Sequence, residues 1–237
     1  MNGAANRPHL VVLSGAGMSA ESGIKTFRDN DGLWENHDVM EVATPEAFAR
    51  NPDLVHRFYN ARRAQLKEVK PNEGHFILAD LEQDHRVSIV TQNVDDLHER
   101  AGSSFVVHLH GELRKVRSTL DPSLIYDWDR DVLPEDRCEK GAPLRPHIVW
   151  FGEQVPQLLA GAELVSQADM VVIVGTSMQV YPAAGLVGYA RPKVPVFYVD
   201  PRPSISNELQ QRLEHLELIE NGASEGLAWL RHQLRNA

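Results

Sequence analysis

Short runs of apolar and β-branched residues recur along the chain, separated by stretches of mixed polarity. The runs are nearly continuous rather than alternating, which is typical of strands buried on both faces of a parallel sheet. Segments with helix-like patterns lie between several of them, as expected when helices cover both faces. Six runs are predicted to be strands: HLVVLSG from His9, VSIVTQN from Val87, FVVHLHG from Phe105, PHIVWFG from Pro146, MVVIVGT from Met170 and VPVFYVD from Val194.

Two segments interrupt this alternation. Residues 31–73 contain no predicted strand but hold PDLVHRFYNARRAQLKEV, whose apolar residues recur at roughly helical spacing. Residues 117–144 are rich in proline, aspartate and arginine and have little periodicity, so they are predicted to be a loop-rich insert. We predict one α/β domain, residues 1–237, with a doubly wound parallel sheet in its large part (1–30, 74–116 and 145–237) and a small module formed by two insertions (31–73 and 117–144).

Polar and small residues cluster where the predicted strands end. In open parallel sheets, ligands bind outside the carboxyl ends of the strands. We therefore expect one cleft to collect the residues at these ends, which are Gly15, Gln92, Asn93, His110, Gly152, Thr176 and Asp200.

Composition narrows the class of protein. A chain of 237 residues with 42% hydrophobic residues can bury one substantial core, and its net charge of −9 opposes nucleic acid and favours basic partners such as lysine-containing segments. The apolar runs are too short to span a membrane, and no charged-then-apolar leader precedes Leu10. The single cysteine, Cys138, excludes an intramolecular disulfide framework, so we expect a cytoplasmic protein that does not engage membranes.

A glycine-rich turn follows the first predicted strand. GAGMSA formally matches the dinucleotide motif GxGxxA through Gly15, Gly17 and Ala20, and small residues there let backbone N–H groups approach a phosphate. A dehydrogenase fingerprint needs a second strand, about 20 residues on, that ends in an acidic residue. The segment DNDGLWENHDVMEVAT offers no such strand, so the turn predicts phosphate binding but disfavours a nicotinamide dehydrogenase.

Five sequence blocks together resemble one family. GAGMSAESGIKTFRD, TQNVDDLH, HLHGEL, RPHIVWFGE and GTSMQVYPAA follow the order of the sirtuin family of NAD-dependent protein lysine deacylases, and the likeness covers nearly the whole chain. The resemblance implies a Rossmann-like sheet with a small module built from two insertions, NAD as co-substrate, and acyl-lysine proteins or peptides as partners. In sirtuins the acyl oxygen of a modified lysine attacks the ribose carbon that bears nicotinamide. Nicotinamide leaves, and the acyl group ends on ADP-ribose.

The resemblance implies that His110 and Asn93 are catalytic. His108 and His110 lie on the same side of a predicted strand, so the pattern alone does not choose between them, whereas the family motif selects His110, next to Gly111. An imidazole with an unperturbed pKa of about 6.5 suits a general base that deprotonates a ribose hydroxyl. Asn93 is implied to orient the sugar and a water molecule, and His108 and His98 are expected to be structural.

The resemblance also implies which residues bind NAD. Gln92 is implied to contact the ribose, and Asp95 to accept a hydrogen bond from the nicotinamide amide. The alternative for this block is a capped turn in which Asp95 or Asp96 opens the next helix. Asp200 stands where the family usually has asparagine for the adenine ribose, so we expect binding with altered affinity. The implied cofactor-binding set is Gly15, Ala16, Gly17, Ile24, Phe27, Arg28, Gln92, Asp95, Gly175, Thr176, Ser177, Asp200 and Ala223.

The segment FYNARR bears on acyl preference. Tyr59 and Arg62 are three residues apart, hence on one helical face, where a phenol and a guanidinium can bind a carboxylate together. They resemble the Tyr-x-x-Arg pair of sirtuins that prefer succinyl-lysine, and Ala43 matches the small residue that widens their pocket. Arg63 lies on nearly the same face, so an ordinary surface arginine remains the alternative. The substrate peptide is expected to add as a strand beside Phe151, Gly152, Glu153 and Val180.

The insert departs from the family pattern. Most sirtuins hold a structural zinc there with two pairs of cysteines, whereas this chain has only Cys138, with Ser118 about where the first pair would begin. A closed tetrahedral zinc site needs four Cys or His ligands, so we predict no zinc. Apolar burial must then replace the metal, and the residues expected to provide it are Leu120, Ile125, Trp128 and Leu133.

The main functional prediction is NAD-dependent deacylation of lysine, with succinyl and malonyl groups favoured and acetyl groups also accepted. One alternative is a non-catalytic sensor of NAD or ADP-ribose, although binding alone would not require an intact set of Asn93, Asp95 and His110. A second alternative is an ADP-ribosyl transferase or NAD glycohydrolase, which differs only in what attacks the ribose.

Overall fold

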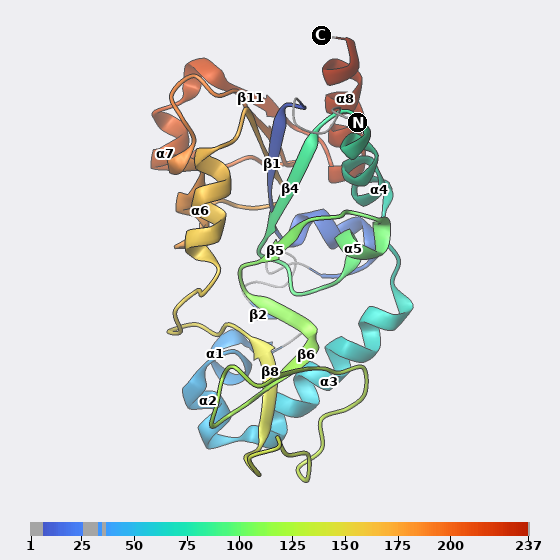
Figure 1. Ribbon diagram of the computed structural model, residues 1–237, viewed down its shortest axis with the longest axis vertical. Coiled ribbons are helices and arrows are strands. Elements are labelled where there is room, and N and C mark those ends of the chain that lie inside the picture. The colour runs from blue at the N-terminus through green and yellow to red at the C-terminus, as the bar shows by residue number, and fades with distance from the viewer. Residues whose placement is uncertain (1–6, 26–32, 35–36, 237) are drawn as a thin grey trace.

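The computed structural model describes residues 7–25, 33–34 and 37–236, and a parallel sheet lies at its centre (Figure 1). Within these residues the sheet has six strands in the order β11-β10-β9-β1-β4-β5. The predicted Rossmann-like α/β fold is confirmed, and five of the six predicted strands lie in this sheet. Its strands are β1 His9–Ser14, β4 Arg86–Thr91, β5 Val106–His108, β9 Met170–Val174, β10 Val196–Val199 and β11 Leu216–Ile219.

The strands pair in register, which brings their carboxyl ends to one edge of the sheet. Val12 of β1 lies opposite Ile89 of β4 on one side and Val172 of β9 on the other. β1 is buried along its whole length because helices cover both faces, and this accounts for its unbroken apolar run. The residues that follow β1, β4 and β9 therefore lie beside one another.

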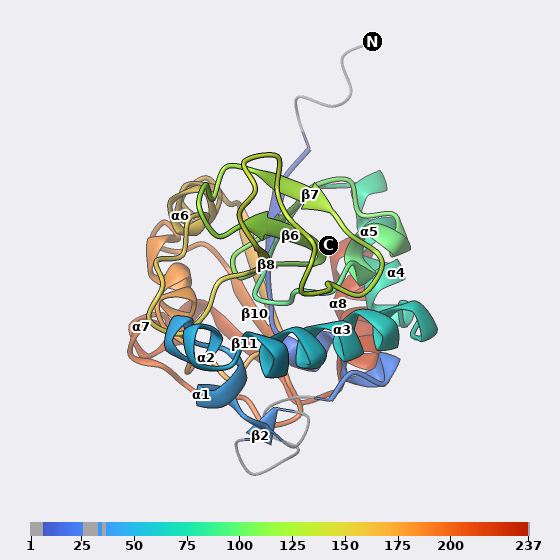
Figure 2. The same cartoon turned by 90° about the horizontal axis from the view of Figure 1, so that it is seen from below.

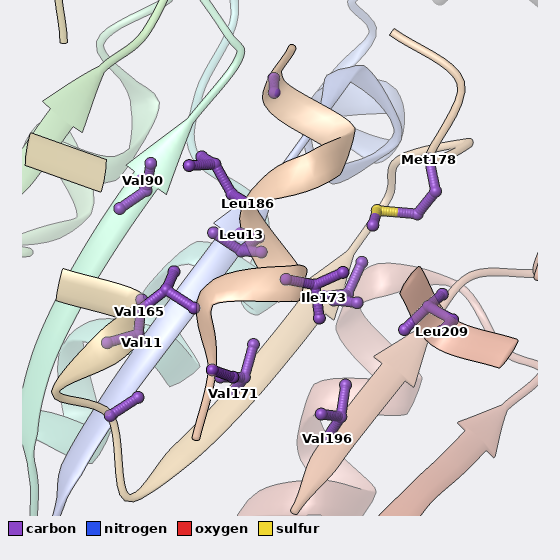
Figure 3. Close-up of a cluster of buried hydrophobic side chains, with 14 of the residues drawn as sticks. Val11, Leu13, Val90, Val165, Val171, Ile173, Met178, Leu186, Val196 and Leu209 are labelled. Carbon is purple, nitrogen blue, oxygen red and sulfur yellow. The ribbon is translucent and has the colours of Figure 1, made fainter. Parts of the chain in front are cut away.

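Helices cover both faces of the sheet (Figure 1). One face carries α6 (Leu158–Ser166), η4 (Ala183–Tyr189) and α7 (Asn207–Gln210), and the other carries α4 (Glu73–Asp80) and α8 (Ala223–Asn236). Figure 3 shows the core of the first face, where Val11 and Ile173 of the sheet pack with Val165 of α6 and Leu186 of η4. No helix in the described ranges is both long and apolar enough to cross a bilayer. The shorter elements of this part are η1 (Ala16–Ser22), η3 (Leu81–Gln83), α5 (Leu97–Ala101) and η5 (Leu213–His215).

A small module lies below the parallel sheet in Figure 1 and nearest the viewer in Figure 2. In the residues that the structure describes, it contains three helices, a short strand pair, and a three-stranded antiparallel sheet in the order β7-β6-β8. The elements are β2 Leu33–Trp34, β3 His37–Asp38, α1 Val39–Val42, α2 Pro45–Arg50, α3 Pro52–Glu68, β6 Gly111–Ser118, β7 Ile125–Asp127 and β8 Leu144–Ile148.

Side-chain caps define the starts of α2 and α3. Thr44 Oγ1 accepts a hydrogen bond from the N–H of Ala47 at 3.0 Å, and Asn51 Oδ1 accepts one from the N–H of Leu54 at 3.1 Å. Each capping residue is followed by a proline, whose fixed φ and missing N–H suit the first helical position. The helix predicted from the apolar spacing of PDLVHRFYN is therefore α3, and it begins at its cap.

The strand predicted from Pro146 belongs to the second sheet. β8 pairs antiparallel with β6 rather than with the parallel sheet, so the predicted divisions near residues 116 and 145 fall inside these two strands. β6 was not predicted from the sequence. Its segment GELRKVRS has one solvent-facing side and four charged residues, so it has no continuous apolar run. β11, at the edge of the parallel sheet, was not predicted for a similar reason, because two of its four residues are exposed.

Apolar side chains pack the insert, but they are largely not the predicted ones. Leu120, Ile125 and Leu133 are 66%, 44% and 43% exposed, so the prediction is wrong for them, and only Trp128 packs against the cluster. In a segment without periodicity, no sequence signal says which apolar residues turn inward. The residues that do form the cluster are Val116, Val132, Cys138 and Leu144, with Leu124, Tyr126, Trp128 and Ala142 against them.

Ser118 and Cys138 face each other beside this cluster. Ser118 Oγ donates to Cys138 Sγ at 3.2 Å and accepts hydrogen bonds from the N–H groups of Leu120 and Asp121. Among the described residues, no three His, Cys, Asp or Glu side chains are grouped so that they could hold a metal ion. The two positions are thus joined by a side-chain hydrogen bond next to buried apolar groups.

Leu144→Ala should lower the free energy of unfolding by about 2–5 kcal/mol, because Leu144 is buried in the insert's cluster. Leu120→Ala, in the same insert, should change it by less than about 0.5 kcal/mol, because Leu120 is mostly solvent-exposed. Urea unfolding of both variants and the wild type, with and without a chelator, measures this. Equal losses in the two variants, or a wild type that the chelator destabilises, would contradict the cluster's role.

Candidate functional site

A cavity of about 790 Å³ lies where the ends of the parallel strands meet the small module. Its volume is within the usual range for small-molecule sites, roughly 300–1,000 Å³. Phe27 and Arg28 lie outside the described residues, and Arg62 lines a different cavity. The predicted site residues that line the large cavity are Gly15, Ala16, Gly17, Ile24, Ala43, Tyr59, Gln92, Asn93, Asp95, His110, Phe151, Gly152, Glu153, Gly175, Thr176, Ser177, Val180, Asp200 and Ala223.

The glycine turn after β1 packs backbone to backbone against the turn after β9. The N–H of Gly17 donates to the carbonyl of Gly175 at 2.7 Å. A Cβ on Gly17 would lie 2.8 Å from the Cα of Gly175, and Gly175 itself has a φ of +60° with no room for a Cβ beside Met18. Only glycine allows this approach and this φ, so the turn's composition reflects close packing as well as access to a ligand.

Asn93 and Asp95 are joined through Ser19, which the sequence analysis misses. Asn93 Nδ2 donates to Ser19 Oγ at 3.1 Å, and Ser19 Oγ donates to Asp95 Oδ2 at 2.9 Å. Ser19 is fully buried and lines the cavity from η1. The sequence signal that could have identified Ser19 as a site residue is its position in the glycine-rich turn after the first strand. The chain of hydrogen bonds fixes the Asn93 amide against the carboxylate.

Asp95 lines the cavity just before α5, whose N-cap residue is Asp96. Its Oδ1 accepts from the N–H of Leu97 at 3.2 Å, two residues along the chain, which is a local turn contact rather than an N-cap bond. Burial raises the pKa of Asp95, and the hydrogen bonds from Leu97 and Ser19 oppose that rise. Hydrogen bonds within the protein thus fix the carboxylate at the cavity wall.

His110 has the geometry of a neutral base. Its Nδ1 lies 3.0 Å from the carbonyl oxygen of Gln92, which can only accept, so Nδ1 carries the proton and Nε2 is left as the basic nitrogen. Burial lowers the pKa of His110, and the hydrogen bond to Gln92 raises it only partly. The ring lines the cavity in this neutral form, ready to accept a proton.

On the small-module side, Ala43 and Tyr59 line the cavity and Tyr59 is fully buried. Trp150 Nε1 donates to the Tyr59 hydroxyl at 2.9 Å, and the Arg145 guanidinium lies 3.4 Å from the centre of the Trp150 ring. Burial raises the pKa of Tyr59, so the phenol keeps its proton. Trp150 is a second cavity residue that was not predicted from the sequence. It lies in the apolar run PHIVWFG, where a tryptophan is expected to pack in the core rather than to donate a hydrogen bond from its indole N–H.

Arg62 and Arg63 take different environments on α3. Arg62 lines an adjoining cavity of about 50 Å³ that shares Ile24, Val94 and Asp95 with the large one. Arg63 is buried, with Nε donating to the carbonyl of Leu113 at 3.1 Å. Of the two arginines, only Arg62 lies beside the large cavity.

The segment after β8 contributes Phe151, Gly152 and Glu153. The Glu153 carboxylate accepts from Arg145 at 2.7 Å, from Arg117 at 3.3 Å and from the N–H of Trp150 at 2.8 Å. Phe151 and Val180 are partly solvent-exposed at the cavity, whereas the Glu153 carboxylate is already engaged within the protein. Its side chain fixes the shape of this segment.

At the far end of the cavity, Asp200 and Ala223 lie after β10 and at the start of α8. Asp200 is buried, and its Oδ1 accepts from the N–H of Arg202 at 2.8 Å. Glu21 Oε1 accepts from the N–H of Ser224 at 3.1 Å and so caps the first turn of α8 beside Ala223. These contacts fix the wall where the parallel sheet meets α8.

This architecture, a Rossmann-like sheet whose strand ends gather a glycine turn, an amide and a neutral histidine, defines a nucleotide-binding α/β protein. The Sir2 family model matches residues 15–182, and the chain belongs to the Sir2 family. It is 58% identical over 194 residues to an NAD-dependent protein deacylase of Helicobacter pylori, covering 82% of this chain and 85% of that one. It is 51% identical over 233 residues to an NAD-dependent protein deacylase of Bacteroides thetaiotaomicron, covering 95% and 97%.

Solved structures give the same family. A Sir2 homologue in complex with NAD is similar with a TM-score of 0.85 and 38% identity, covering 98% of this chain and 91% of that one. A mutant Sir2 homologue in complex with ADP-ribose has a TM-score of 0.86 and 37% identity, covering 98% and 94%.

Two further histidines are buried side by side near the ends of β1 and β4. His98 Nε2 lies 3.0 Å from Ser14 Oγ, which itself donates to Thr91 Oγ1, and the ring centres of His75 and His98 are 4.8 Å apart. Burial lowers the pKa of His75 to about 4 and holds the pKa of His98 well below its ordinary value. Both rings are therefore neutral in the folded protein at neutral pH, as befits structural residues.

Stability should fall as the pH drops below about 6.5, because the unfolded chain then takes up protons that folded His75 and His98 resist. For His75 the slope should approach about 1.4 kcal/mol per pH unit between the unfolded pKa and its folded pKa of about 4. His75→Gln, whose amide can keep the capping contact with Asn72, should flatten this dependence. Urea unfolding at pH 7.5, 6 and 5 measures the slopes, and parallel curves for variant and wild type would contradict the assignment.

Proposed function

We propose that this protein is an NAD-dependent protein lysine deacylase that removes succinyl and malonyl groups in preference to acetyl groups. Membership of the Sir2 family supports NAD as the co-substrate, and the two curated relatives carry the name NAD-dependent protein deacylase. The observation that carries the proposal is one cavity that brings Asn93 and His110, near the ends of the parallel strands, together with Ala43 and Tyr59 of the small module. Such a cavity can hold a dinucleotide and an acyl chain at once.

The lining of the cavity suits a dinucleotide. Asp200 and Ala223 would hold the adenosine, the close turn at Gly17 would face the phosphates, and Asn93 with Asp95 would hold the nicotinamide ribose. When bound, NAD supplies the ribose carbon from which nicotinamide leaves and to which the acyl oxygen adds. The carboxylate of Asp200 can accept from the hydroxyls of a ribose, as an asparagine oxygen would.

His110 is the general base in this proposal. Its Nδ1–H is held by the carbonyl of Gln92, so Nε2 is the nitrogen that accepts a proton from a ribose hydroxyl. Its lowered pKa keeps Nε2 unprotonated at neutral pH. Asn93, held by Ser19, presents its amide at a fixed angle to the same sugar. A binding-only protein would have no need for such a base.

The acyl preference is supported by the surroundings of Tyr59. Tyr59 presents its phenol at the cavity wall, where Trp150 Nε1 donates to the hydroxyl, and a phenol can donate a hydrogen bond to a carboxylate, which is a strong acceptor. Arg62, one helical turn along α3, lines the adjoining cavity toward which a succinyl chain would extend. A phenol and a guanidinium in two cavities that share Ile24 would thus bind the acyl carboxylate, which an acetyl group lacks.

The substrate peptide would bind as an added strand. Phe151, Gly152 and Val180 line the cavity mouth, where an extended backbone could pair with theirs. The Glu153 carboxylate is engaged by Arg145 and shapes this segment, and the Glu153 backbone would pair with the peptide beside that of Gly152. Recognition through the backbone tolerates many peptide sequences, so acylated proteins of varied sequence are the expected partners.

His110→Ala should lower kcat for deacylation by roughly 10²–10⁴-fold, because it removes the general base. The affinity for NAD should change little, since binding depends mainly on the other cavity residues. Mass spectrometry of a succinyl-lysine peptide measures turnover, and calorimetry measures NAD binding. Full NAD-dependent turnover by the variant would show that His110 is not the base.

The wild type should remove succinyl from a lysine peptide faster than acetyl from the matched peptide, only with NAD, and with or without chelator. Arg62→Met should raise KM for the succinyl peptide by roughly 10–100-fold, the worth of a hydrogen bond to a charged group, and leave the acetyl peptide nearly unaffected. Arg57→Met, which removes an exposed arginine from the same helix, is the matched control. Equal losses on both peptides in Arg62→Met would refute the carboxylate contact.

The same assay separates the two alternative functions. Turnover of neither peptide, with NAD still bound, would favour a sensor. Loss of NAD without any peptide present would favour an NAD glycohydrolase. Faster removal of acetyl than succinyl would leave a deacylase in place but remove the proposed preference.

A further inference from the structure

Two histidines hold neighbouring carbonyl groups of the loop after β4, but their second nitrogens differ. His110 Nδ1 lies 3.0 Å from the carbonyl oxygen of Gln92, and His108 Nδ1 lies 2.9 Å from the carbonyl oxygen of Asn93. The second nitrogen of His110 belongs to the cavity wall, whereas His108 Nε2 lies 2.7 Å from Glu99 Oε1 on α5. The two rings therefore hold the same loop in different chemical states.

The contacts of His108 require both of its ring nitrogens to donate. A peptide carbonyl can only accept, so Nδ1 must carry a proton. A carboxylate can also only accept, so Nε2 must carry a second proton if Glu99 is ionised. Glu99 is 40% exposed and so remains in contact with water, which favours its ionised form, while the His108 side chain is 8% exposed. The geometry thus describes an imidazolium in a nearly buried ion pair.

We propose that His108 is a positioning residue that stays protonated at neutral pH, and that its ion pair with Glu99 holds the Asn93 loop in its working geometry. The positioning role of the pair rests on the proposed function, whereas the charge state of His108 can be measured without any turnover. His108 contacts neither the cavity nor the reacting atoms, so it acts through Asn93.

The charged groups around His108 favour this state. Burial by itself lowers the pKa of His108, but the hydrogen bond and charge of Glu99, helped by Asn93 and Glu112, outweigh burial and leave the pKa raised. Burial likewise raises the pKa of Glu99, and the bond to His108 with the charge of Lys115 reverses this, so that the pKa is lowered. Removing Glu99 would leave the charge of the nearly buried His108 unpaired, which is costly, whereas Glu99 itself remains in contact with water.

The positive charge also bears on the site itself. Burial raises the pKa of Asp95 overall, and the positive charge of His108 acts against that rise. An ionised Asp95 keeps accepting from Ser19, and Ser19 in turn holds Asn93. The neighbouring His98 on α5 is neutral, with its pKa held well below the ordinary value, so it adds no opposing charge at neutral pH. The cation thus supports both the backbone and the side chain of Asn93.

Nuclear magnetic resonance decides the charge state directly. In protein labelled with ¹⁵N in histidine, His108 should show two protonated ring nitrogens at pH 7.5, whereas His110 should show a neutral ring protonated at Nδ1. Glu99→Gln keeps an acceptor for Nε2 but removes the charge, so His108 in that variant should lose its second proton at a lower pH than in the wild type. A neutral His108 in the wild type at pH 7.5 would overturn the proposal.

Kinetics tests the positioning role. Glu99→Gln should lower kcat for deacylation by roughly ten- to hundredfold through misplacement of Asn93, with little change in KM for NAD. The alkaline fall of kcat, as His108 loses its proton, should move to lower pH in this variant. Glu112→Gln is the matched control, because Glu112 is a second carboxylate near His108 but pairs with Lys115, and it should leave kcat nearly unchanged.

The outcomes separate this inference from the proposed function. A doubly protonated His108 together with unchanged kcat and pH profile in Glu99→Gln would reduce the pair to a structural contact and overturn the positioning role. If the wild type shows no deacylation at all, the proposed function fails, and the positioning role is then judged from the side-chain amide resonances of Asn93. These should shift and broaden in Glu99→Gln but not in Glu112→Gln, and unchanged resonances would refute the role.

Discussion

The in-register pairing of β1 with β4 and β9 is the constraint on which the cavity depends. Because Leu13 lies opposite both Val90 and Ile173, the three strands end together and their following turns meet. A slip of one residue in any pair would turn every side chain of that strand to the other face and separate these turns. The backbone contact between Gly17 and Gly175 fits only this register, and it forms the part of the cavity wall where two strand ends come closest.

Once the strand ends meet, the environment of each histidine determines its chemistry. His98 and His75 are neutral because they are buried without a carboxylate partner within hydrogen-bonding distance in the described residues. His110 is neutral with a fixed tautomer because its Nδ1 is held by a carbonyl group. His108, equally short of solvent, is a cation because a carbonyl and a carboxylate both demand a proton from it. Four rings with one intrinsic pKa are thus given different charge states and tautomers by their surroundings.

Buried apolar side chains hold together the insert that carries Cys138. Among the described residues its cluster contains Val116, Val132 and Leu144. Arg63 ties α3 to this part through the carbonyl groups of Leu113 and Arg130. The module also carries Tyr59 and Trp150 to the cavity, so its packing and this wall of the cavity are parts of one structure.

The sequence by itself determined the α/β class, five strands of the parallel sheet, helix α3 and the blocks from which the site is built. Continuous apolar runs and helical spacing are local signals, and strand ends are where ligands bind, so these features follow from the chain alone. The tertiary structure decided what depends on distant neighbours: the second sheet with β6 and β8, the roles of Ser19 and Trp150, the exposure of Leu120, and the placement of Arg62 beside rather than within the large cavity. The physical reason is that strands with one exposed face carry no continuous apolar signal. In addition, the state of a polar side chain is set by partners far away in the chain, such as Tyr59 and Trp150, which are 91 residues apart, and these become neighbours only after folding.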